Sequence, residues 1–595
     1  MRNDEAIYSY AVERMVDTGD WVTPRSIPTD WPFFEKPPLK FWMVTAGIKS
    51  GLLPRDEAGL RFLDGLFGGI SLLYVFAIGA MLGGPLCGIV AGLVLFTLDP
   101  LLFEHGFRSN NMEASVVLGY AGGVYHFARW VQSSMRARGQ AFAFAAYFFL
   151  AFMTKLVAAL FLPAACLVAF VWGGRPIERM KVAWKDWLLP ILTFIVLAAP
   201  WFVYHTIKSG HEFWDILIGE HVYKRFTASL DVSHIHPWHY YFTETWRELG
   251  YSGSQVVVAL GALMLLYAAI RERSWMARLV FTWAALPLIA ISIGTSKLLH
   301  YAYPFWPPIA LGAGFLVART VQALDSPSAG QLASSIGRLM PEGIRTWAGA
   351  GAGPRRVVAS VAAVALGIAL ITAIVGPWTV DIGSLRIFSN SSVLRPLVFG
   401  ALLLLVVGYS LTVVRMVGAI ALILMLPFGK YVEKIQHMSR VDHPLRATRN
   451  CMAEVNATHG LGQRGAISVS GDILHHSYYY YFWRQGPWVV SKEFSPTVVE
   501  QRLTDPAQQT PIFIAKEHFQ QLTKAWNANQ GPAKPGALVA PAATLDARGA
   551  ALWDGVTVDD NIALLLPGPY RACIQPLRAA GALQLWRPTS STREQ

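Results

Sequence analysis

The sequence predicts a mainly α-helical, polytopic membrane protein with a small α/β domain at its C-terminal end. Three observations predict this class. Of 595 residues, 53% are hydrophobic and only 15% are charged. The mean hydropathy is +0.37. Apolar runs follow one another between residues 60 and 429, many of them close to the length that crosses about 30 Å of hydrocarbon. A soluble globular chain does not have this composition.

The first 58 residues contain no apolar run of about 20 residues, so we expect them to lie on the membrane rather than in it. Apolar residues recur at helical spacing from Ala6 to Met15, with charged residues between them. This pattern is typical of an interfacial helix. A second such helix is expected to start at Pro38, because proline is tolerated in the first turn of a helix.

The apolar runs that follow predict about twelve membrane spans. The boundary at Thr154-Lys155 is the least distinct, because a charged residue separates two short runs there. The predicted spans are 60–82, 85–103, 112–130, 140–154, 156–173, 186–205, 254–270, 278–294, 302–318, 357–377, 394–413 and 415–429.

The basic residues predict the orientation of these spans. If every span crosses, four loops rich in Lys and Arg fall on one side, which is then the cytoplasmic side. Those loops lie at 129–138, 175–185, 271–278 and 319–356. The N-terminal segment, the large loop 206–253 and the region after 430 then lie outside, which is the periplasmic side in a bacterium. The net charge of +12 includes no basic tract interleaved with aromatic residues, so nucleic acid is not an expected partner.

The region 430–595 has a different pattern. Short apolar runs at 466–469, 511–514 and 583–586 are typical of strands, and 496–503 and 516–527 are typical of helices. We therefore predict a small periplasmic α/β domain here. Cys451 and Cys573 both lie in it and could form a disulfide in an exported domain. The predicted domains are 1–58, 59–429 and 430–595.

Polar and ionisable residues gather on the predicted outer side. Such residues in or beside spanning segments are costly and usually face a cavity or a partner. As an alternative for single residues, Lys155 and Lys297 could extend to the membrane surface, and Arg108 could pair with Glu104 or Glu113. The set comprises Asp4, Glu5, Glu35, Lys36, Arg108 to Glu113, Lys155, Glu220, His221, Lys224, Arg225, Ser296, Lys297, His300 and Tyr301.

These residue types are suited to a narrow range of chemistry. Lys and Arg at the membrane surface bind an anionic head group, and Arg offers a forked donor to phosphate oxygens. Carboxylates beside them can orient or deprotonate an acceptor hydroxyl. The sequence has no Gly-rich phosphate loop, no paired-cysteine metal motif and no Gly-x-Ser-x-Gly motif. Together, these features indicate transfer from a phosphate-bearing lipid to an alcohol, without energy from a nucleotide.

The order of these motifs resembles that in bacterial membrane glycosyltransferases similar to the lipid A aminoarabinose transferases and, more distantly, the protein O-mannosyltransferases. The resemblance covers roughly residues 1–320. It implies a GT-C fold and a polyprenyl-phosphate sugar donor, undecaprenyl phosphate in a bacterium. The motifs are Asp4-Glu5, Asp20-Trp21, Glu35-Lys36-Pro37-Pro38, Arg108 with Glu113, Thr154-Lys155, Pro200-Trp201, Glu220-His221, Arg225-Phe226, Ser296-Lys297 and His300-Tyr301.

The resemblance also implies roles for particular residues. Asp4 matches the catalytic carboxylate of the first outer loop, and Glu113 matches a second acidic position that is often Asp in relatives. Lys36 matches a lysine near the lipid phosphate, and Lys297 and Tyr301 match positions that contact the donor. Further candidates for the donor phosphate are Arg108, Lys155 and Arg225.

Glu35 and His221 match positions that resemble a metal site in the aminoarabinose branch. A divalent metal, zinc or another, is therefore a possible cofactor. One Glu and one His are too few to define a zinc site. A hydrogen-bonded Glu-His pair remains the alternative.

The family usually has a membrane span before the Asp-Glu pair, so we expect thirteen crossings once such a span is added upstream. The expected function is glycosyl transfer from a polyprenyl-phosphate-linked sugar, on the periplasmic side of the inner membrane. The expected acceptor is a hydroxyl or phosphate of lipid A, lipopolysaccharide core, another envelope glycan or a protein. A flippase of lipid-linked sugars and an inactive scaffold are the alternatives, although no internal repeat typical of transporters is visible.

Overall fold

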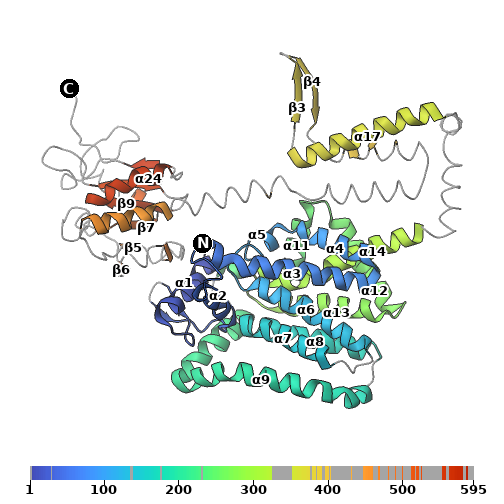
Figure 1. Cartoon of the computed structure of the whole chain (residues 1–595), viewed down its shortest axis with the longest axis horizontal. Helices are drawn as coiled ribbons and strands as arrows, with labels where there is room; N and C mark the ends of the chain where they lie inside the picture. Colours follow the sequence, from blue (N-terminus) through green and yellow to red (C-terminus); the bar gives the residue numbers. More distant parts are fainter. Residues whose placement is uncertain are drawn as a thin grey trace. The chain divides into compact units, whose positions relative to one another are not determined.

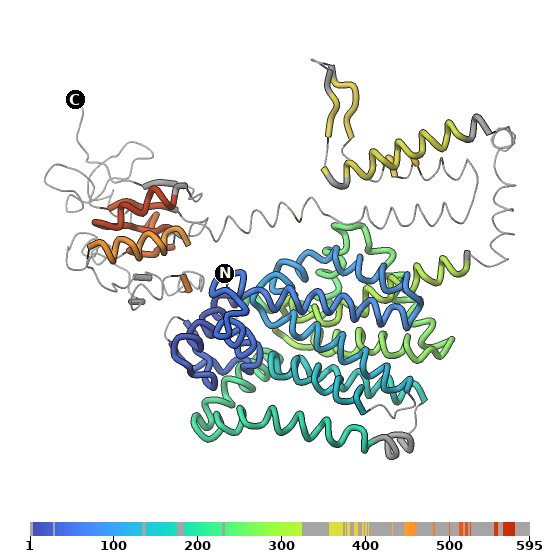
Figure 2. The backbone as a smooth tube through the Cα atoms, viewed as in Figure 1, coloured from blue at the N-terminus to red at the C-terminus, as the bar shows by residue number. Residues whose placement is uncertain are grey.

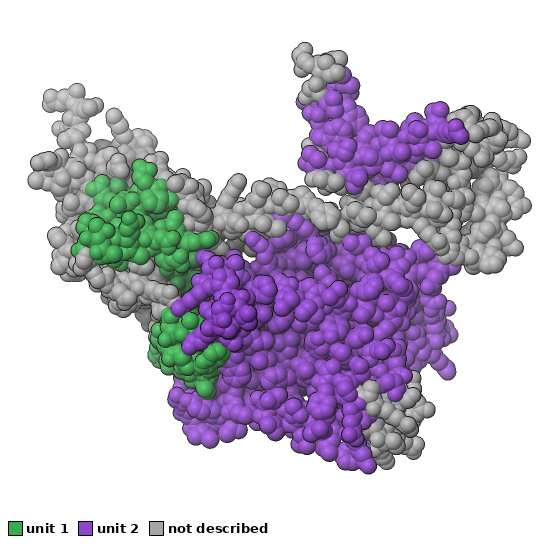
Figure 3. All heavy atoms as spheres, in the orientation of Figure 1, with its two compact units in different colours: residues 1–33, 433–595 green, residues 34–432 purple. Residues whose placement is uncertain are grey.

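The computed structural model describes residues 3–27, 30–133, 138–174, 177–228, 232–324 and 352–375, and shorter pieces from 378 to 586. The chain divides into two compact units, which are coloured separately in Figure 3. Unit 1 comprises Met1–Phe33 and Glu433–Gln595, and unit 2 comprises Phe34–Val432. Each unit is described by itself.

Unit 2 is a bundle of helices, many of which run side by side and are joined by short turns (Figures 1 and 2). Its first half contains α2 (Leu39–Lys49), α3 (Glu57–Gly83), α4 (Pro85–Phe96), α5 (Asp99–Phe103), α6 (Glu113–Gln132), α7 (Arg138–Lys155), α8 (Val157–Trp172) and α9 (Ile177–Trp214). Its second half contains the π-helix η1 (Asp215–Lys224), α10 (Arg225–Thr227), the 3₁₀ helix η2 (Val232–His234), α11 (Tyr240–Gly250), α12 (Gln255–Ile270), α13 (Trp275–Ile293), the 3₁₀ helix η3 (Leu299–Phe305), α14 (Trp306–Leu324), α17 (Ala352–Val375) and the hairpin β3 (Trp378–Ile382) and β4 (Leu385–Asn390).

Local chemistry determines where several of these helices begin and end. The Asp56 side chain caps α3 by accepting hydrogen bonds from the backbone N–H groups of Ala58 and Gly59. Helix α7 ends at Lys155 and α8 begins at Val157, because Leu156 between them has a φ of 38°. The predicted boundary at Thr154-Lys155 is therefore confirmed as a helix boundary.

Helix α6 is buried along most of its length, and glycines allow α7 to approach it closely. A Cβ added at Gly119 would lie 2.7 Å from the Cβ of Ala151, and one at Gly122 would lie 2.6 Å from the ring of Tyr147. Small residues at such contacts are typical of helix packing in membranes. Close packing fixes the start of α6 relative to the end of α7, where two candidate site residues lie.

Three helical stretches in the described part of the chain are long and apolar enough to cross a membrane: Glu57–Gly83, Trp184–Thr227 and Trp275–Ile293. Shorter apolar helices are Pro85–Phe96, Val157–Trp172, Gln255–Ile270 and Arg356–Thr372. Six of the seven coincide closely with predicted spans, or with part of one. The seventh, Trp184–Thr227, contains the predicted span 186–205 but continues into the predicted outer loop 206–253. The total of twelve spans stays a prediction. The predicted span 85–103 is interrupted, because α4 ends at Phe96 and α5 begins at Asp99. The predicted spans 394–413 and 415–429 lie almost wholly outside the described residues.

Unit 1 contains α1 (Asn3–Thr18), a small antiparallel pair and a six-stranded mixed sheet. The strands β1 (Arg25–Ser26) and β2 (Trp31–Pro32) form the pair. The sheet has the order β10-β8-β9-β7-β5-β6, in which β5 runs parallel to both of its neighbours and the other pairs are antiparallel. Its strands are β5 (Ile467–Ser468), β6 (Val489–Val490), β7 (Ile512–Ala515), β8 (Trp553–Thr557), β9 (Ile562–Pro567) and β10 (Gln584–Trp586).

The three strands predicted at 466–469, 511–514 and 583–586 are confirmed as β5, β7 and β10. The helix expected near the N-terminus is confirmed as α1, and its apolar residues from Ala6 to Met15 are largely buried. The helix predicted at 496–503 falls almost entirely outside the described residues, and only parts of 516–527 are described.

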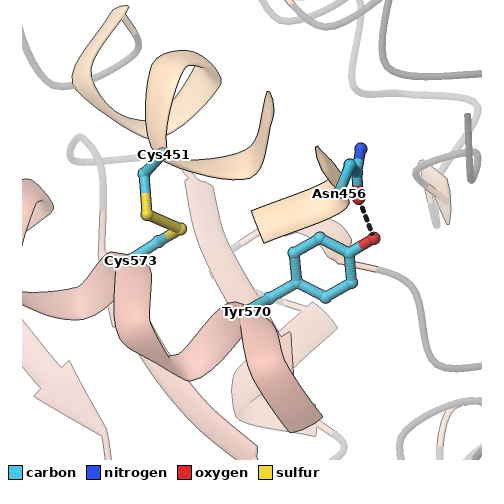
Figure 4. Close-up of a disulfide and its surroundings, with 4 residues drawn as sticks. All are labelled: Cys451, Asn456, Tyr570 and Cys573. Atoms are coloured by element: carbon cyan, nitrogen blue, oxygen red, sulfur yellow. Dashed lines mark hydrogen bonds between the residues drawn. A yellow bond between two sulfur atoms is a disulfide. The ribbon is translucent and has the colours of Figure 1, made fainter. Parts of the chain in front are cut away.

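Cys451 and Cys573 form a disulfide in unit 1, which confirms the pairing that the sequence allowed (Figure 4). Their Cα atoms lie 5.6 Å apart, within the usual range for a disulfide. The bond joins the helical segment 446–458 to the 3₁₀ helix η6 (Gly568–Cys573), which leads into α24 (Ile574–Ala579). Beside it, the Tyr570 hydroxyl donates a hydrogen bond of 2.6 Å to Asn456 Oδ1.

Candidate functional site

The loop 104–112 leads directly into α6. The candidate residue Arg108 lies in this loop, and the candidate residue Glu113 follows it as the first residue of α6. Backbone hydrogen bonds from Phe107 N to Leu101 O (2.8 Å) and from Arg108 N to Leu102 O (3.0 Å) fold this loop back onto α5. Only glycine fits at position 106, because an added Cβ would lie 1.6 Å from Leu101 O. Arg108 is consequently held half-buried just ahead of α6.

Glu113 is the first residue of α6, where the helix dipole favours a carboxylate. Its Oε1 lies 2.5 Å from Nζ of Lys155, the last residue of α7. The side chain of Glu113 is 5% exposed and that of Lys155 is 15% exposed. The two candidate residues therefore form one largely buried ion pair that joins the start of α6 to the end of α7.

His300 adds a second nitrogen beside the same carboxylate. Its Nε2 lies 3.7 Å from Glu113 Oε1, and its ring stacks on His105 with the centroids 4.6 Å apart. Burial lowers the pKa of His300 well below its ordinary value, although the Glu113 carboxylate opposes this shift. His300 is therefore neutral at neutral pH, and Lys155 is the cation that pairs with Glu113.

Tyr301 joins this ion pair to a second cation. The Lys155 ammonium lies 5.0 Å from the centroid of the Tyr301 ring. Arg225 Nη1, from α10, donates a hydrogen bond to the Tyr301 hydroxyl. The contacts thus form a continuous chain from Glu113 through Lys155 and Tyr301 to Arg225, although the four residues are far apart in the sequence.

The π-helix η1 brings His221 to Glu35. Helix α9 breaks at Gly210, where φ is 56°, and the chain continues as η1, a helix type that is frequent at functional sites. His221 Nε2 lies 3.5 Å from Glu35 Oε2. Lys36, the next residue, donates a hydrogen bond of 3.3 Å to the Glu35 carbonyl. Arg225 follows His221 by four residues, at the start of α10 directly after η1, so the Glu35-Lys36 segment lies towards the Arg225 end of the chain of contacts.

Glu35 and His221 do not by themselves fit a metal ion. Zinc takes four ligands in structural sites and three protein ligands in catalytic sites. Within the described residues, no group of three or more His, Cys, Asp or Glu side chains could hold a metal ion. The buried His221 Nδ1 has no hydrogen-bond partner in that part of the chain. We therefore treat Glu35 and His221 as a polar pair and assign no step to a metal.

Lys297 occupies a different place from the other candidate cations. Its ammonium donates to the carbonyl oxygens of His236 (2.9 Å) and Gly294 (2.5 Å), and its side chain is almost fully buried. Burial also lowers its pKa. The adjacent Ser296 N donates to the carbonyl of Arg225 at 3.0 Å. Lys297 thus stabilises the loop that holds the backbone of Arg225.

Asp4 lies half-buried in the first turn of α1, in unit 1. Two charged residues of unit 2, Lys40 and Asp64, were not among the predicted site residues. Their signal was present in the sequence, since each is a charged residue within a largely apolar helix, and such charges usually have a partner.

The chain is similar to known membrane glycosyltransferases in sequence. A family described as dolichyl-phosphate-mannose-protein mannosyltransferase matches residues 35–204. An undecaprenyl phosphate-alpha-4-amino-4-deoxy-L-arabinose arabinosyl transferase of Pseudomonas fluorescens is 26% identical over 332 residues, which cover 53% of this chain and 55% of that protein. Its counterpart in Aeromonas hydrophila is 28% identical over 319 residues, which cover 52% and 54%. The chain spans about half the length of the curated relatives it matches.

Solved structures extend the likeness to the fold. ArnT from Cupriavidus metallidurans bound to undecaprenyl phosphate superposes with a TM-score of 0.58 at 17% identity, over 95% of this chain and 94% of that chain. The apo state of the same protein gives a TM-score of 0.54. The chain therefore has an ArnT-like GT-C fold and resembles the bacterial aminoarabinose transferases and the protein mannosyltransferases, as its motifs predicted.

Proposed function

We propose that this protein is an inner-membrane glycosyltransferase that takes a sugar from an undecaprenyl-phosphate donor. The observation that carries the proposal is the chain of contacts from Glu113 through Lys155 and Tyr301 to Arg225. It places two cations on one tyrosine beside a buried carboxylate, in a fold similar to that of a protein solved with undecaprenyl phosphate. Two cations with a hydroxyl are suited to a lipid phosphate.

On the donor side, Arg225 and Lys155 bind the phosphate, and Tyr301 orients both cations. Arg225 has the central role, because its planar guanidinium can contact two phosphate oxygens at once. Phosphate leaves with negative charge on its oxygens, so fixed cations stabilise the transition state more than an acid would. We assign Lys36 and Arg108 to the same phosphate. Lys297 contributes by stabilising the loop in which the neighbouring Ser296 N donates a hydrogen bond to the Arg225 carbonyl.

On the acceptor side, Asp4 orients or deprotonates the attacking group. Glu113 is a weaker base, because the adjacent Lys155 ammonium favours its ionised form. Its role is to hold Lys155 towards the donor. In the complete reaction, the anomeric carbon of the sugar forms a bond to the acceptor oxygen and loses its bond to the lipid phosphate, which departs with the electron pair.

The acceptor is a hydroxyl or phosphate of lipid A, lipopolysaccharide core, another envelope glycan or a protein. We place the site on the periplasmic side, in a chain organised as an outer segment 1–58, a membrane domain 59–429 and an outer domain 430–595. The disulfide between Cys451 and Cys573 supports this orientation, because disulfides persist in oxidising compartments such as the periplasm.

The test is transfer of radiolabelled sugar from an undecaprenyl-phosphate donor by the purified full chain. Wild-type protein should form a labelled glycolipid or glycoprotein, and Asp4→Asn and Lys36→Ala should form much less while keeping the wild-type melting temperature. A protein that only moves lipid-linked sugar between leaflets, without a labelled product, would instead be a flippase. Wild-type rates in both variants would refute the assigned roles.

A further inference from the structure

Lys40 and Asp64 form a fully buried ion pair between α2 and α3. Lys40 Nζ lies 2.7 Å from Asp64 Oδ1, and the two side chains are 1% and 0% exposed. The same ammonium donates a hydrogen bond to the backbone carbonyl of Asn111. Burying charges this deeply is costly, and a well-packed apolar pair commonly gives equal or greater stability. Stability alone therefore does not explain why an ion pair is buried at this position.

The three groups connect the two segments that carry candidate site residues. Lys40 lies in the first turn of α2, four residues after Lys36, and two prolines with restricted φ stand between them. Asn111 lies three residues after Arg108 and two before Glu113. The Lys40 ammonium thus links the Glu35-Lys36 segment to the loop that ends at Glu113.

The loop has little freedom to move independently of this contact. Asn111 N donates to Ser109 O (2.7 Å), and Asn111 Nδ2 donates to Ser109 Oγ (2.9 Å), so the turn closes on itself. One helical turn after Asp64, Gly68 of α3 meets the ring of Phe107, because an added Cβ there would lie 2.4 Å from Phe107 Cγ. Phe107 therefore rests directly on α3, and Asn111 is tied to α3 through Lys40 of α2 and its ion pair with Asp64.

We propose that the Lys40–Asp64 ion pair is a positioning device, which fixes the Glu35-Lys36 segment relative to the Arg108–Glu113 segment through the Asn111 carbonyl. Neither residue is assigned a contact with substrate. This proposal rests on the proposed function in one respect: both segments are assigned to binding the sugar donor. Misplacing a catalytic group by about 1 Å costs on the order of 100-fold in rate, so a small shift of the loop is expected to affect turnover.

The test compares full-length variants in detergent by melting temperature, by hydrogen exchange of the amides in 106–112 and by sugar-transfer kinetics. Lys40→Met alone should lower the melting temperature, because it leaves Asp64 as a buried unpaired charge. The double variant Lys40→Met, Asp64→Leu should recover the melting temperature. It should still show faster exchange in 106–112 and a kcat reduced at least about tenfold, because the Asn111 carbonyl has lost its donor.

Ser71→Ala is the matched control. Ser71 is a buried polar residue of α3 whose hydroxyl donates to Phe67 O within the helix, seven residues and about two helical turns after Asp64. Its kcat and its exchange in 106–112 should remain at wild-type values. If the apolar double variant does not fold, the uncharged Lys40→Gln, Asp64→Asn variant replaces it. Its two amides can hydrogen-bond to each other, while the Gln side chain is one atom shorter than that of Lys and leaves the Asn111 carbonyl farther from its donor.

A double variant with wild-type melting temperature, wild-type exchange in 106–112 and wild-type kcat would show that the pair serves stability alone. The exchange measurement needs no substrate, so it decides the positioning role separately from the activity. Failure of the wild-type protein to transfer sugar would refute the proposed function, and unchanged exchange in the double variant would refute the positioning role.

Discussion

The Lys155 ammonium lies 2.5 Å from Glu113 Oε1 and joins the end of α7 to the start of α6. This contact orients Lys155, whose ammonium also lies over the Tyr301 ring. The buried carboxylate of Glu113 therefore helps to fix the position of the Lys155 ammonium, and the proposed donor site depends on this carboxylate.

Glu113→Gln should leave the fold intact and reduce sugar transfer about 10- to 100-fold, because Lys155 loses the charge that holds it and charged hydrogen bonds contribute about 1.5–3 kcal/mol. Lys155→Met should also lower the melting temperature, because it leaves Glu113 unpaired. A double-mutant cycle on transfer rate measures the coupling. Additive effects of the two substitutions would show that Glu113 and Lys155 act independently.

Arg225→Lys should reduce kcat/KM for the lipid donor more than Tyr301→Phe does. The Lys variant keeps the charge but loses the planar fork, whereas Tyr301→Phe removes one hydrogen bond, worth about 0.5–1.5 kcal/mol. Steady-state kinetics with varied donor concentration checks the order. Full activity in Arg225→Lys would mean that the charge alone is sufficient.

His300 should make the protein less stable in mild acid. Its folded pKa is lowered by burial, so the unfolded chain takes up a proton on this residue first as the pH falls below about 6.5. The groups facing it are Glu113, Lys155, His105 and Arg225. The melting temperature of the wild type should therefore fall more steeply between pH 7 and pH 5 than that of His300→Gln. Parallel curves would exclude His300 as the source.

Chelation should leave transfer unchanged, because Glu35 and His221 lie 3.5 Å apart as a polar pair and the described residues offer no third ligand for a metal. The measurement is the transfer rate before and after dialysis against EDTA, together with the metal content of the purified protein. Loss of activity that zinc restores would overturn this interpretation and would make Glu35 and His221 metal ligands.

Reduction of the Cys451–Cys573 disulfide should destabilise unit 1, because the bond closes a loop with a sequence separation of 122 residues. Removing a native disulfide from a small domain costs about 2–5 kcal/mol. Mass spectrometry after alkylation, with and without reductant, tests the bond itself. Limited proteolysis of Cys451→Ser should then cut within 446–579 faster than in the control Cys87→Ser, which alters a free buried cysteine in unit 2.

The sequence was sufficient to predict a mainly helical fold with apolar helices and most helix positions, since composition and apolar run length are local properties. It was not sufficient to predict contacts. Lys297 matched a donor-contacting position, yet its ammonium lies among backbone carbonyls of its own loop. The π-helix that presents His221 has no sequence signal, because its bonding pattern depends on tertiary packing.

The ion pair between Lys40 and Asp64 is a second contact that the sequence did not predict. Each is visible as a charged residue in a largely apolar helix, but their pairing depends on how α2 and α3 pack. The break between α4 and α5 at Thr97 and Leu98 lies within an apolar run, so run length alone predicted one continuous span.

Arg225, supported by Tyr301, is proposed to bind the phosphate of a lipid-linked sugar. The most direct measurement is transfer of radiolabelled sugar from an undecaprenyl-phosphate donor by purified wild-type protein and by Arg225→Gln, with both proteins shown to be folded by their melting temperature. The wild type should form labelled product, and the variant should do so at a rate reduced about 10- to 100-fold. Equal rates in the two proteins, or no labelled product from the wild type, would contradict this proposal.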